Sequence, residues 1–186
     1  MKLPLVATVL CACWWIAEFI RPLFQAKPPS RDRDKASSRL WDIAHLVGVL
    51  GVVVGFTTIG HVQRGQEFIA ISGVSLMLVG ISIRWLAIFT LGKYFTGKIR
   101  ILDDHRLVRT GLYRHVRHPA YAGALLAYVG FGFAFSNWIS FLLIFLPILF
   151  AAVWRMRIEE QVLREVLGTE YLEYSAETKR LIPGIY

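Results

Sequence analysis

The chain alternates between long apolar segments and short basic ones, and this alternation is the strongest constraint on its fold. The apolar segments are Leu3–Phe24, Trp41–Val62, Phe68–Gly92, Tyr121–Phe135 and Trp138–Trp154. A helix needs about 20 mainly apolar residues to cross the hydrocarbon core of a bilayer. Hydrophobic residues make up 55% of the 186, which is too many for a soluble domain of this size. We therefore predict an all-α integral membrane protein with about five transmembrane helices.

The last two apolar segments are separated only by Ser136 and Asn137, so we predict that they form an antiparallel helical hairpin. Each arm falls short of the about 20 residues of a full span, and the sequence leaves open whether the hairpin crosses the bilayer. After Trp154 the apolar positions continue at helical spacing as far as Gly168. This pattern predicts an amphipathic C-terminal helix that ends at that glycine.

Three features of the first spans bear on packing and processing. Gly51 and Gly55 form a GxxxG pair that lets a neighbouring helix approach closely. Arg84 lies inside the third span, where we expect it either to reach the membrane surface or to pair with Glu18 of the first; a role beside a ligand is the less favoured alternative. The first span is predicted to be a retained helix, because no small-residue cleavage site of a signal peptide follows it.

Lysine and arginine are unevenly distributed among the connecting segments. Residues 21–39 contain six, residues 93–117 contain seven and residues 155–186 contain five. The turn after the second span contains one and the hairpin turn contains none. Because segments rich in lysine and arginine stay in the cytoplasm, we predict a multi-pass protein with its N-terminus outside. Residues 21–39, the basic loop of residues 93–117 and the C-terminal region would then lie on the cytoplasmic side, in contact with membrane lipids.

The remaining composition excludes several classes of function. The formal net charge is +8, but the basic residues lie between apolar segments and not along one soluble face, so no nucleic-acid partner is expected. Cys11 and Cys13 lie two positions apart in the first span and do not face each other, which predicts no disulfide. His105, His115 and His118 are candidate metal ligands, but the last two lie three apart on a loop without a carboxylate or cysteine companion, and we predict no metal site.

Residues 113–121 gather two arginines, two histidines and two tyrosines between long apolar segments. Polar groups gathered at a membrane edge often serve a ligand. Pro119 directly follows His118, so the proline is predicted to start the next helix and to keep His118 out of helical geometry. A simple membrane anchor explains Arg114 and Arg117 but does not explain this His-Pro step.

Residues 90–183 carry an ordered series of short motifs. They are His105-Arg-Leu107-Val108, Gly111-x-Tyr113, Arg117-His118-Pro119-x-Tyr121-x-Gly123, Arg155-x3-Glu159-Glu160, Gly168-x2-Tyr171-x2-Tyr174 and Arg180-x2-Pro183. In order and in approximate spacing the series resembles the isoprenylcysteine carboxyl methyltransferase family of integral-membrane enzymes that use S-adenosyl-L-methionine. The first three spans match that family only in hydropathy. The resemblance implies a three-helix membrane region over residues 1–92 and a catalytic region over residues 93–186.

The resemblance also implies which residues form the site. The cofactor pocket would be lined by Lys98, His105, Arg106, Leu107, Val108, Tyr113, His118, Pro119, Ala120, Tyr121, Glu159 and Glu160. Arg155 would bind the substrate, and Arg155 and His118 are the predicted catalytic residues. Lys98 departs from the family, whose eukaryotic members tend to carry a cofactor-contacting glutamine at that position.

The chemistry of methyl transfer makes modest demands on such a site. The protein must hold donor and acceptor in line, exclude water and shield the sulfonium charge, for which Tyr113 and Tyr121 offer aromatic faces. A carboxylate acceptor is already ionised at neutral pH and would be positioned by Arg155. An amine or thiol acceptor would need His118 or His115 as a base. We favour a lipophilic, isoprenylcysteine-like carboxylate from the bilayer; the physiological acceptor and the oligomeric state stay open.

Other functions remain as alternatives. The C-terminal half also resembles phospholipid and amine methyltransferases, and the segment from Arg180 to Tyr186 resembles membrane sterol reductases that use NADPH. Glu159 and Glu160 favour the methyltransferases, because carboxylates complement a cationic cofactor and repel nucleotide phosphates. A non-catalytic membrane scaffold would account for the basic loops but not for the ordered motifs.

Overall fold

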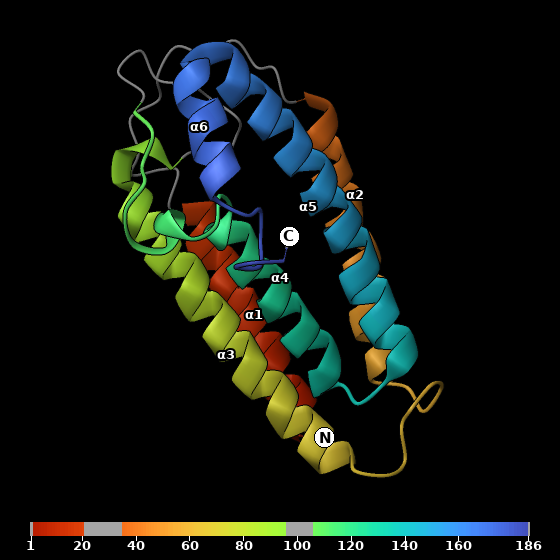
Figure 1. Cartoon of the computed structure of the whole chain (residues 1–186). Coiled ribbons are helices and arrows are strands. Elements are labelled where there is room, and N and C mark those ends of the chain that lie inside the picture. Colours follow the sequence, from red (N-terminus) through yellow and green to blue (C-terminus); the bar gives the residue numbers. More distant parts are fainter. Residues whose placement is uncertain (1, 21–34, 96–105, 186) are drawn as a thin grey trace.

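The computed structural model describes residues 2–20, 35–95 and 106–185, and its regular elements over these ranges are helical. The α-helices are α1 (Lys2–Ile20), α2 (Lys35–Gly55), α3 (Gln66–Leu91), α4 (Pro119–Ala134), α5 (Trp138–Leu167) and α6 (Thr169–Glu177), and two short 3₁₀ helices are η2 (Gly92–Tyr94) and η3 (Gly111–Arg114). The long helices run side by side, and α6 lies at the end of the bundle where α5 finishes (Figure 1). The predicted all-α class is confirmed. In the described part, three helices are long and apolar enough to cross a membrane: Ser37–Gly55, Gln66–Tyr94 and Trp138–Leu167.

The α2 helix begins before the predicted Trp41 and ends before the predicted Val62. Its early end has a tertiary cause. The side-chain amide of Asn137, in the hairpin turn, donates to the carbonyl oxygens of Val54 (3.3 Å) and Ile59 (2.7 Å). Carbonyls at the end of a helix lack intrahelical partners, so an amide from a distant turn favours termination at this point.

The α4–α5 hairpin is confirmed, but its second arm is longer than predicted. As predicted, Pro119 occupies the first turn of α4 and His118 adopts a non-helical conformation (φ −126°, ψ 55°). The predicted short arm and the amphipathic tail helix are one continuous helix, α5, of 30 residues. No glycine or proline interrupts the chain after Trp154, and the helix ends at Gly168, whose φ of 55° suits glycine.

Close backbone contacts between glycines join α3 to α4. A Cβ atom added to Gly80 would lie 2.6 Å from the carbonyl oxygen of Gly123, and one added to Gly73 would lie 2.7 Å from that of Gly130. No real side chain fits at such distances. The two helices are therefore antiparallel neighbours whose approach depends on these glycines.

The α2 and α5 helices form a second antiparallel pair. A Cβ atom on Gly51 would lie 2.8 Å from Ile144 Cγ1, and one on Gly55 would lie 2.8 Å from the Ser140 hydroxyl. This geometry confirms the prediction that the GxxxG pair lets another helix approach closely. The hairpin turn links this pair to the α3–α4 pair (Figure 1).

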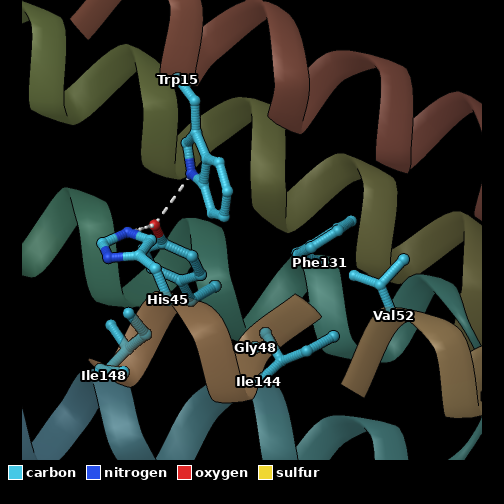
Figure 2. Close-up of a pocket in the computed structure, with 9 residues that line it drawn as sticks. Trp15, His45, Gly48, Val52, Phe131, Ile144 and Ile148 are labelled. Atoms are coloured by element: carbon cyan, nitrogen blue, oxygen red, sulfur yellow. Dashed lines mark hydrogen bonds between the residues drawn. The ribbon is translucent and has the colours of Figure 1, made fainter. Parts of the chain in front are cut away.

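A chain of hydrogen bonds connects α1, α2 and α4 within the bundle (Figure 2). Trp15 Nε1 lies 3.0 Å from the hydroxyl of Tyr128, which lies 2.8 Å from His45 Nε2, and His45 Nδ1 lies 2.8 Å from the carbonyl oxygen of Trp41. An indole only donates and a carbonyl only accepts. The Tyr128 hydroxyl therefore donates to His45 Nε2 when the ring is neutral, and each group in the chain is satisfied. The apolar cavity beside it measures only about 10 Å³.

Glu18 and Arg84 form an ion pair between α1 and α3, with Arg84 Nε 2.5 Å from Glu18 Oε1. Of the two arrangements expected from the sequence, the structure therefore has the pairing across the bundle. Pairing satisfies both charges within the bundle, which lowers the cost of burying them.

Candidate active site

Residues 106–118, the described part of the basic loop, lie beside the C-terminal segment of residues 178–185 at one end of the bundle (Figure 1). The backbone N–H of Arg117 donates to the carbonyl of Lys179 at 2.7 Å, and that of His118 donates to the carbonyl of Arg180 at 3.0 Å. The bridge between Val116 and Lys179 is parallel. Because these bonds precede Pro119, they fix the point at which the chain enters α4.

Glu160 is the centre of a cluster of cations beneath this loop. Its carboxylate, on a residue only 1% exposed, accepts from Arg180 at 3.0 Å (Nε to Oε1) and 2.8 Å (Nη2 to Oε2). Arg117 Nε and His118 Nε2 each lie 3.2 Å from Oε1, and Arg164 lies 3.6 Å from Oε2. A carboxylate accepts only, so His118 Nε2 carries the proton in this bond. Glu160 thus ties the His-Pro loop to the C-terminal segment.

The neighbouring carboxylate, Glu159, has a different partner. The hydroxyl of Tyr121 donates to Glu159 Oε2 at 3.0 Å, and Arg155 Nε donates to the same hydroxyl at 3.1 Å. Arg155 is only 8% exposed. One phenol from α4 therefore joins the two charges on successive turns of α5. The ring of His118 lies edge-on to that of Tyr121, with centroids 5.6 Å apart.

Tyr113 lies in a small apolar cluster between η3, α3 and the start of α4. Its buried partners are Ala87 and Ala120, and Val108 packs against them. Burial raises the pKa of Tyr113, and the Glu159 carboxylate raises it further, while the positive charge of Arg84 opposes the rise. The phenol therefore stays neutral at physiological pH.

The α6 helix holds Tyr113 from the other side. The hydroxyl of Tyr174 donates to the carbonyl oxygen of Tyr113 at 2.7 Å. Burial raises the pKa of Tyr174 to about 12, so this donor keeps its proton at neutral pH. The Arg109 guanidinium lies 5.6 Å from the Tyr174 ring centroid, an attractive cation–π contact. The helix that follows Gly168 therefore supports the loop that carries Tyr113.

Tyr171 is only 1% exposed, yet its hydroxyl has no hydrogen-bond partner within the described part of the chain. Burial raises the pKa of this phenol, and Glu160 raises it further, whereas Arg117 lowers it. A buried hydroxyl is costly unless something binds it. Tyr171 is thus a polar group that a ligand or a water molecule can satisfy.

The structure gathers most of the predicted site residues but not all of them. Tyr113, His118, Pro119, Ala120, Tyr121, Arg155, Glu159 and Glu160 come together at the junction of η3, α4 and α5. Arg106 is exposed and Leu107 and Val108 are half-buried before η3. Lys98 and His105 lie outside the described residues. Among the described residues, no group of three or more His, Cys, Asp or Glu side chains could hold a metal ion.

Sequence reasoning missed the roles of Arg117 and Arg180. It read the first as a topology signal and the second as part of a motif, whereas both bind Glu160. The available signal was the order of charges in the motif series, where Arg117 comes before the Glu159-Glu160 step and Arg180 comes after it. Only the fold shows which of those glutamates the arginines bind.

Comparison with known proteins extends the resemblance beyond the motifs. The profile of the isoprenylcysteine carboxyl methyltransferase (ICMT) family matches residues 73–165. Protein-S-isoprenylcysteine O-methyltransferase B of Arabidopsis thaliana is 32% identical over 156 residues, which are 80% of this chain and 76% of that protein. A probable protein-S-isoprenylcysteine O-methyltransferase of Oryza sativa subsp. indica is 36% identical over 120 residues, 63% of each chain. The human protein-S-isoprenylcysteine O-methyltransferase is 30% identical over 63% of this chain and 42% of its own length.

A solved structure described as the eukaryotic intramembrane Ras methyltransferase ICMT shares the fold. It aligns with a TM-score of 0.56 and 21% identity, over 83% of this chain and 55% of that one. Its likeness covers the bundle described above, and three helices here have the length and apolar composition of membrane spans. The protein is therefore an integral membrane protein, and the family profile and the plant relatives establish that the chain belongs to the isoprenylcysteine carboxyl methyltransferase family.

Proposed function

We propose that the protein transfers a methyl group from S-adenosyl-L-methionine to the carboxylate of a lipophilic, isoprenylcysteine-like acceptor. The observation that carries this proposal is the chain of contacts from Arg155 through Tyr121 to Glu159. It holds a guanidinium and a carboxylate on two sides of one phenol. Transfer from a cationic donor to an anionic acceptor needs opposite charges held side by side, in a site that excludes water.

Arg155 is suited to the acceptor. It follows the apolar part of α5, so an acceptor with its tail among the helices would present its polar head at this height. A guanidinium binds both oxygens of a carboxylate at once. The carboxylate is ionised at neutral pH and needs no base. An amine acceptor would instead need His118 as a base through Nδ1, since Nε2 donates to Glu160.

The remaining residues suit a cationic cofactor. When bound, S-adenosyl-L-methionine supplies an activated methyl group on a sulfonium. The charge of Glu159 and the aromatic faces of Tyr113 and Tyr121 would balance that positive charge, each ring contributing about 0.5–2 kcal/mol. The unpartnered hydroxyl of Tyr171 offers a further polar contact. These groups fit the cofactor, and Lys98, His105, Arg106, Leu107 and Val108 stay predicted members of the pocket.

We assign Glu160 a supporting role. Its carboxylate is buried and binds Arg117, His118 and Arg180, so its negative charge is already balanced. Direct contact between Glu160 and the cofactor stays a prediction. Its surroundings favour a residue that holds the His-Pro loop, and with it Tyr121, in position.

The membrane arrangement follows the charge bias. We propose that α1 to α5 all lie in the bilayer, with the N-terminus outside and residues 93–119 and 155–186 in the cytoplasm. The acceptor would then enter sideways from the lipid and the cofactor from the cytoplasm. In this arrangement residues 1–92 form a membrane region and residues 93–186 carry the catalytic residues.

Methyl transfer can be tested on purified protein in lipid vesicles. The donor is methyl-labelled S-adenosyl-L-methionine, and the acceptor is a small prenyl thioether with a free carboxylate. We expect a labelled methyl ester, which base hydrolyses to labelled methanol. The matched acceptor with its carboxylate replaced by a carboxamide should stay unlabelled. A base-stable labelled product, or none from either acceptor, would contradict carboxyl methylation.

A further inference from the structure

Glu18 and Arg84 form an ion pair that the proposed reaction does not use. Arg84 Nε donates to Glu18 Oε1 at 2.5 Å, and the two side chains are 14% and 18% exposed. The Trp14 indole donates to the same oxygen at 3.2 Å. The guanidinium lies 5.9 Å from the Trp14 ring centroid and 6.0 Å from that of Phe95. Because an isolated charge inside a membrane-embedded bundle is costly, each partner depends on the other.

The pair lies against the predicted cofactor pocket. Arg84 Nη1 donates to the carbonyl oxygen of Ala120 at 3.2 Å. Ala120 packs with Tyr113 in one apolar cluster. Arg84 and Glu159 both approach the Tyr113 phenol closely enough to influence its pKa, in opposite directions. A positive charge and a negative charge therefore both lie near the Tyr113–Ala120 part of the pocket.

An unbalanced guanidinium at this place would oppose a cationic ligand. It would add to the positive end of the α4 dipole, which begins at Pro119. Repulsion between like charges stays substantial over several ångströms where water is largely excluded. Glu18 balances the charge of Arg84 while the hydrogen bond from Arg84 to Ala120 remains in place.

We infer that Glu18 is a positioning residue that sets the charge of the cofactor pocket by balancing Arg84, so that the pocket accepts the cationic sulfonium. The inference rests on the proposed function. A simple clamp between α1 and α3 is the competing account. Both accounts predict a less stable protein when the pair is broken. Only charge balance predicts that S-adenosyl-L-methionine and S-adenosylhomocysteine respond differently, because they differ by one methyl group and one positive charge.

Calorimetry on the full chain in detergent can measure the Kd of both compounds. Glu18→Gln keeps the shape of the side chain and leaves Arg84 charged. It should raise the Kd of S-adenosyl-L-methionine about tenfold and the Kd of S-adenosylhomocysteine less than about twofold. Arg84→Gln should shift the ratio of the two Kd values the opposite way. The double variant has the wild-type net charge and should restore the wild-type ratio.

Glu67→Gln is the matched control, because Glu67 is exposed in the first turn of α3, at the far end from Arg84. It should leave both Kd values unchanged. Equal weakening of the two compounds by Glu18→Gln would reduce the pair to a clamp and overturn the inference. If Glu18→Gln does not fold, Arg84→Gln decides alone, since an unchanged ratio overturns the inference. Wild-type protein that binds neither compound would instead remove the proposed function.

Discussion

Arg155 and Glu159 are linked through a third residue, the hydroxyl of Tyr121, which accepts from Arg155 at 3.1 Å and donates to Glu159 at 3.0 Å. Charges one turn apart on an exposed helix contribute only about 0.3–0.5 kcal/mol to its stability. Here the linking phenol comes from α4, and Arg155 is buried. The arrangement therefore fixes the directions of both charges relative to the start of α4, which a surface pair does not do.

Tyr121→Phe tests this link. The substitution removes the hydroxyl but keeps the ring, so the protein should fold while Arg155 and Glu159 lose their fixed orientation. We expect kcat for methyl transfer to fall by about 10- to 100-fold, the equivalent of about one hydrogen bond to a charged group. Steady-state kinetics in lipid vesicles measures this.

Tyr128→Phe, one heptad further along α4, provides the contrast. It removes the partner of the half-buried Trp15 and His45 side chains, and should lower the free energy of unfolding by about 1–3 kcal/mol in total. Its kcat at a temperature well below unfolding should stay near wild type. Equal losses of kcat in the two variants would contradict a specific role for Tyr121.

Arg155→Lys should damage acceptor binding. Lysine keeps the charge but loses the planar fork that matches a carboxylate. We expect the KM for the acceptor to rise about tenfold or more, while calorimetry finds the Kd for S-adenosyl-L-methionine within about twofold of wild type. Arg157→Lys, at an exposed position two residues on, should change neither. Loss of cofactor affinity in Arg155→Lys alone would place Arg155 in the cofactor site instead.

Substitution of the two adjacent glutamates by glutamine should have different effects, on stability for Glu160 and on cofactor binding for Glu159. Glu160→Gln removes the buried carboxylate charge that binds Arg117, His118 and Arg180. It should lower the free energy of unfolding by about 3–5 kcal/mol, read from chemical unfolding in detergent. Glu159→Gln should weaken S-adenosyl-L-methionine binding with a smaller loss of stability. Glu173→Gln, on the exposed face of α6, is the control for both. The reverse pattern would exchange the two assignments.

Glycines of the α3–α4 contact should tolerate no side chain. Gly80→Ala would place a Cβ atom 2.6 Å from a backbone oxygen of Gly123. Backbone cannot move aside as a side chain can, so we expect a loss of about 1–3 kcal/mol or more. At Gly48 no atom lies within 4 Å of the added carbon, and Gly48→Ala should be neutral or stabilising. Thermal unfolding of both variants compares them directly.

The proposed topology can be tested with single cysteines in a Cys11→Ala/Cys13→Ala background. A cysteine at Arg64, in the exposed turn before α3, should react only with an impermeant reagent applied outside. One at Glu173, on α6, should react only from the cytoplasmic side. Labelling of both from the same face would contradict the assigned orientation.

The amino-acid sequence determined the features that depend on local order. The succession of apolar segments predicted the long helices, because a helix that crosses a bilayer needs a long run of apolar residues. The Pro119 step predicted where α4 begins, and Gly168 predicted where α5 ends, since both act through their own backbone conformations. The motif series placed the site near Tyr121 and Arg155, and the structure brings those residues together.

Only the tertiary structure decided the features that depend on partners distant in sequence. The end of α2 depends on Asn137, more than 70 residues away, and the sequence left α6 unassigned. Glu159 and Glu160 are adjacent in the chain, and a motif treats them alike. Successive helical residues point about 100° apart, so one reaches Tyr121 on α4 and the other reaches Arg180 in the C-terminal segment. What each carboxylate can do follows from that partner, which the fold alone supplies.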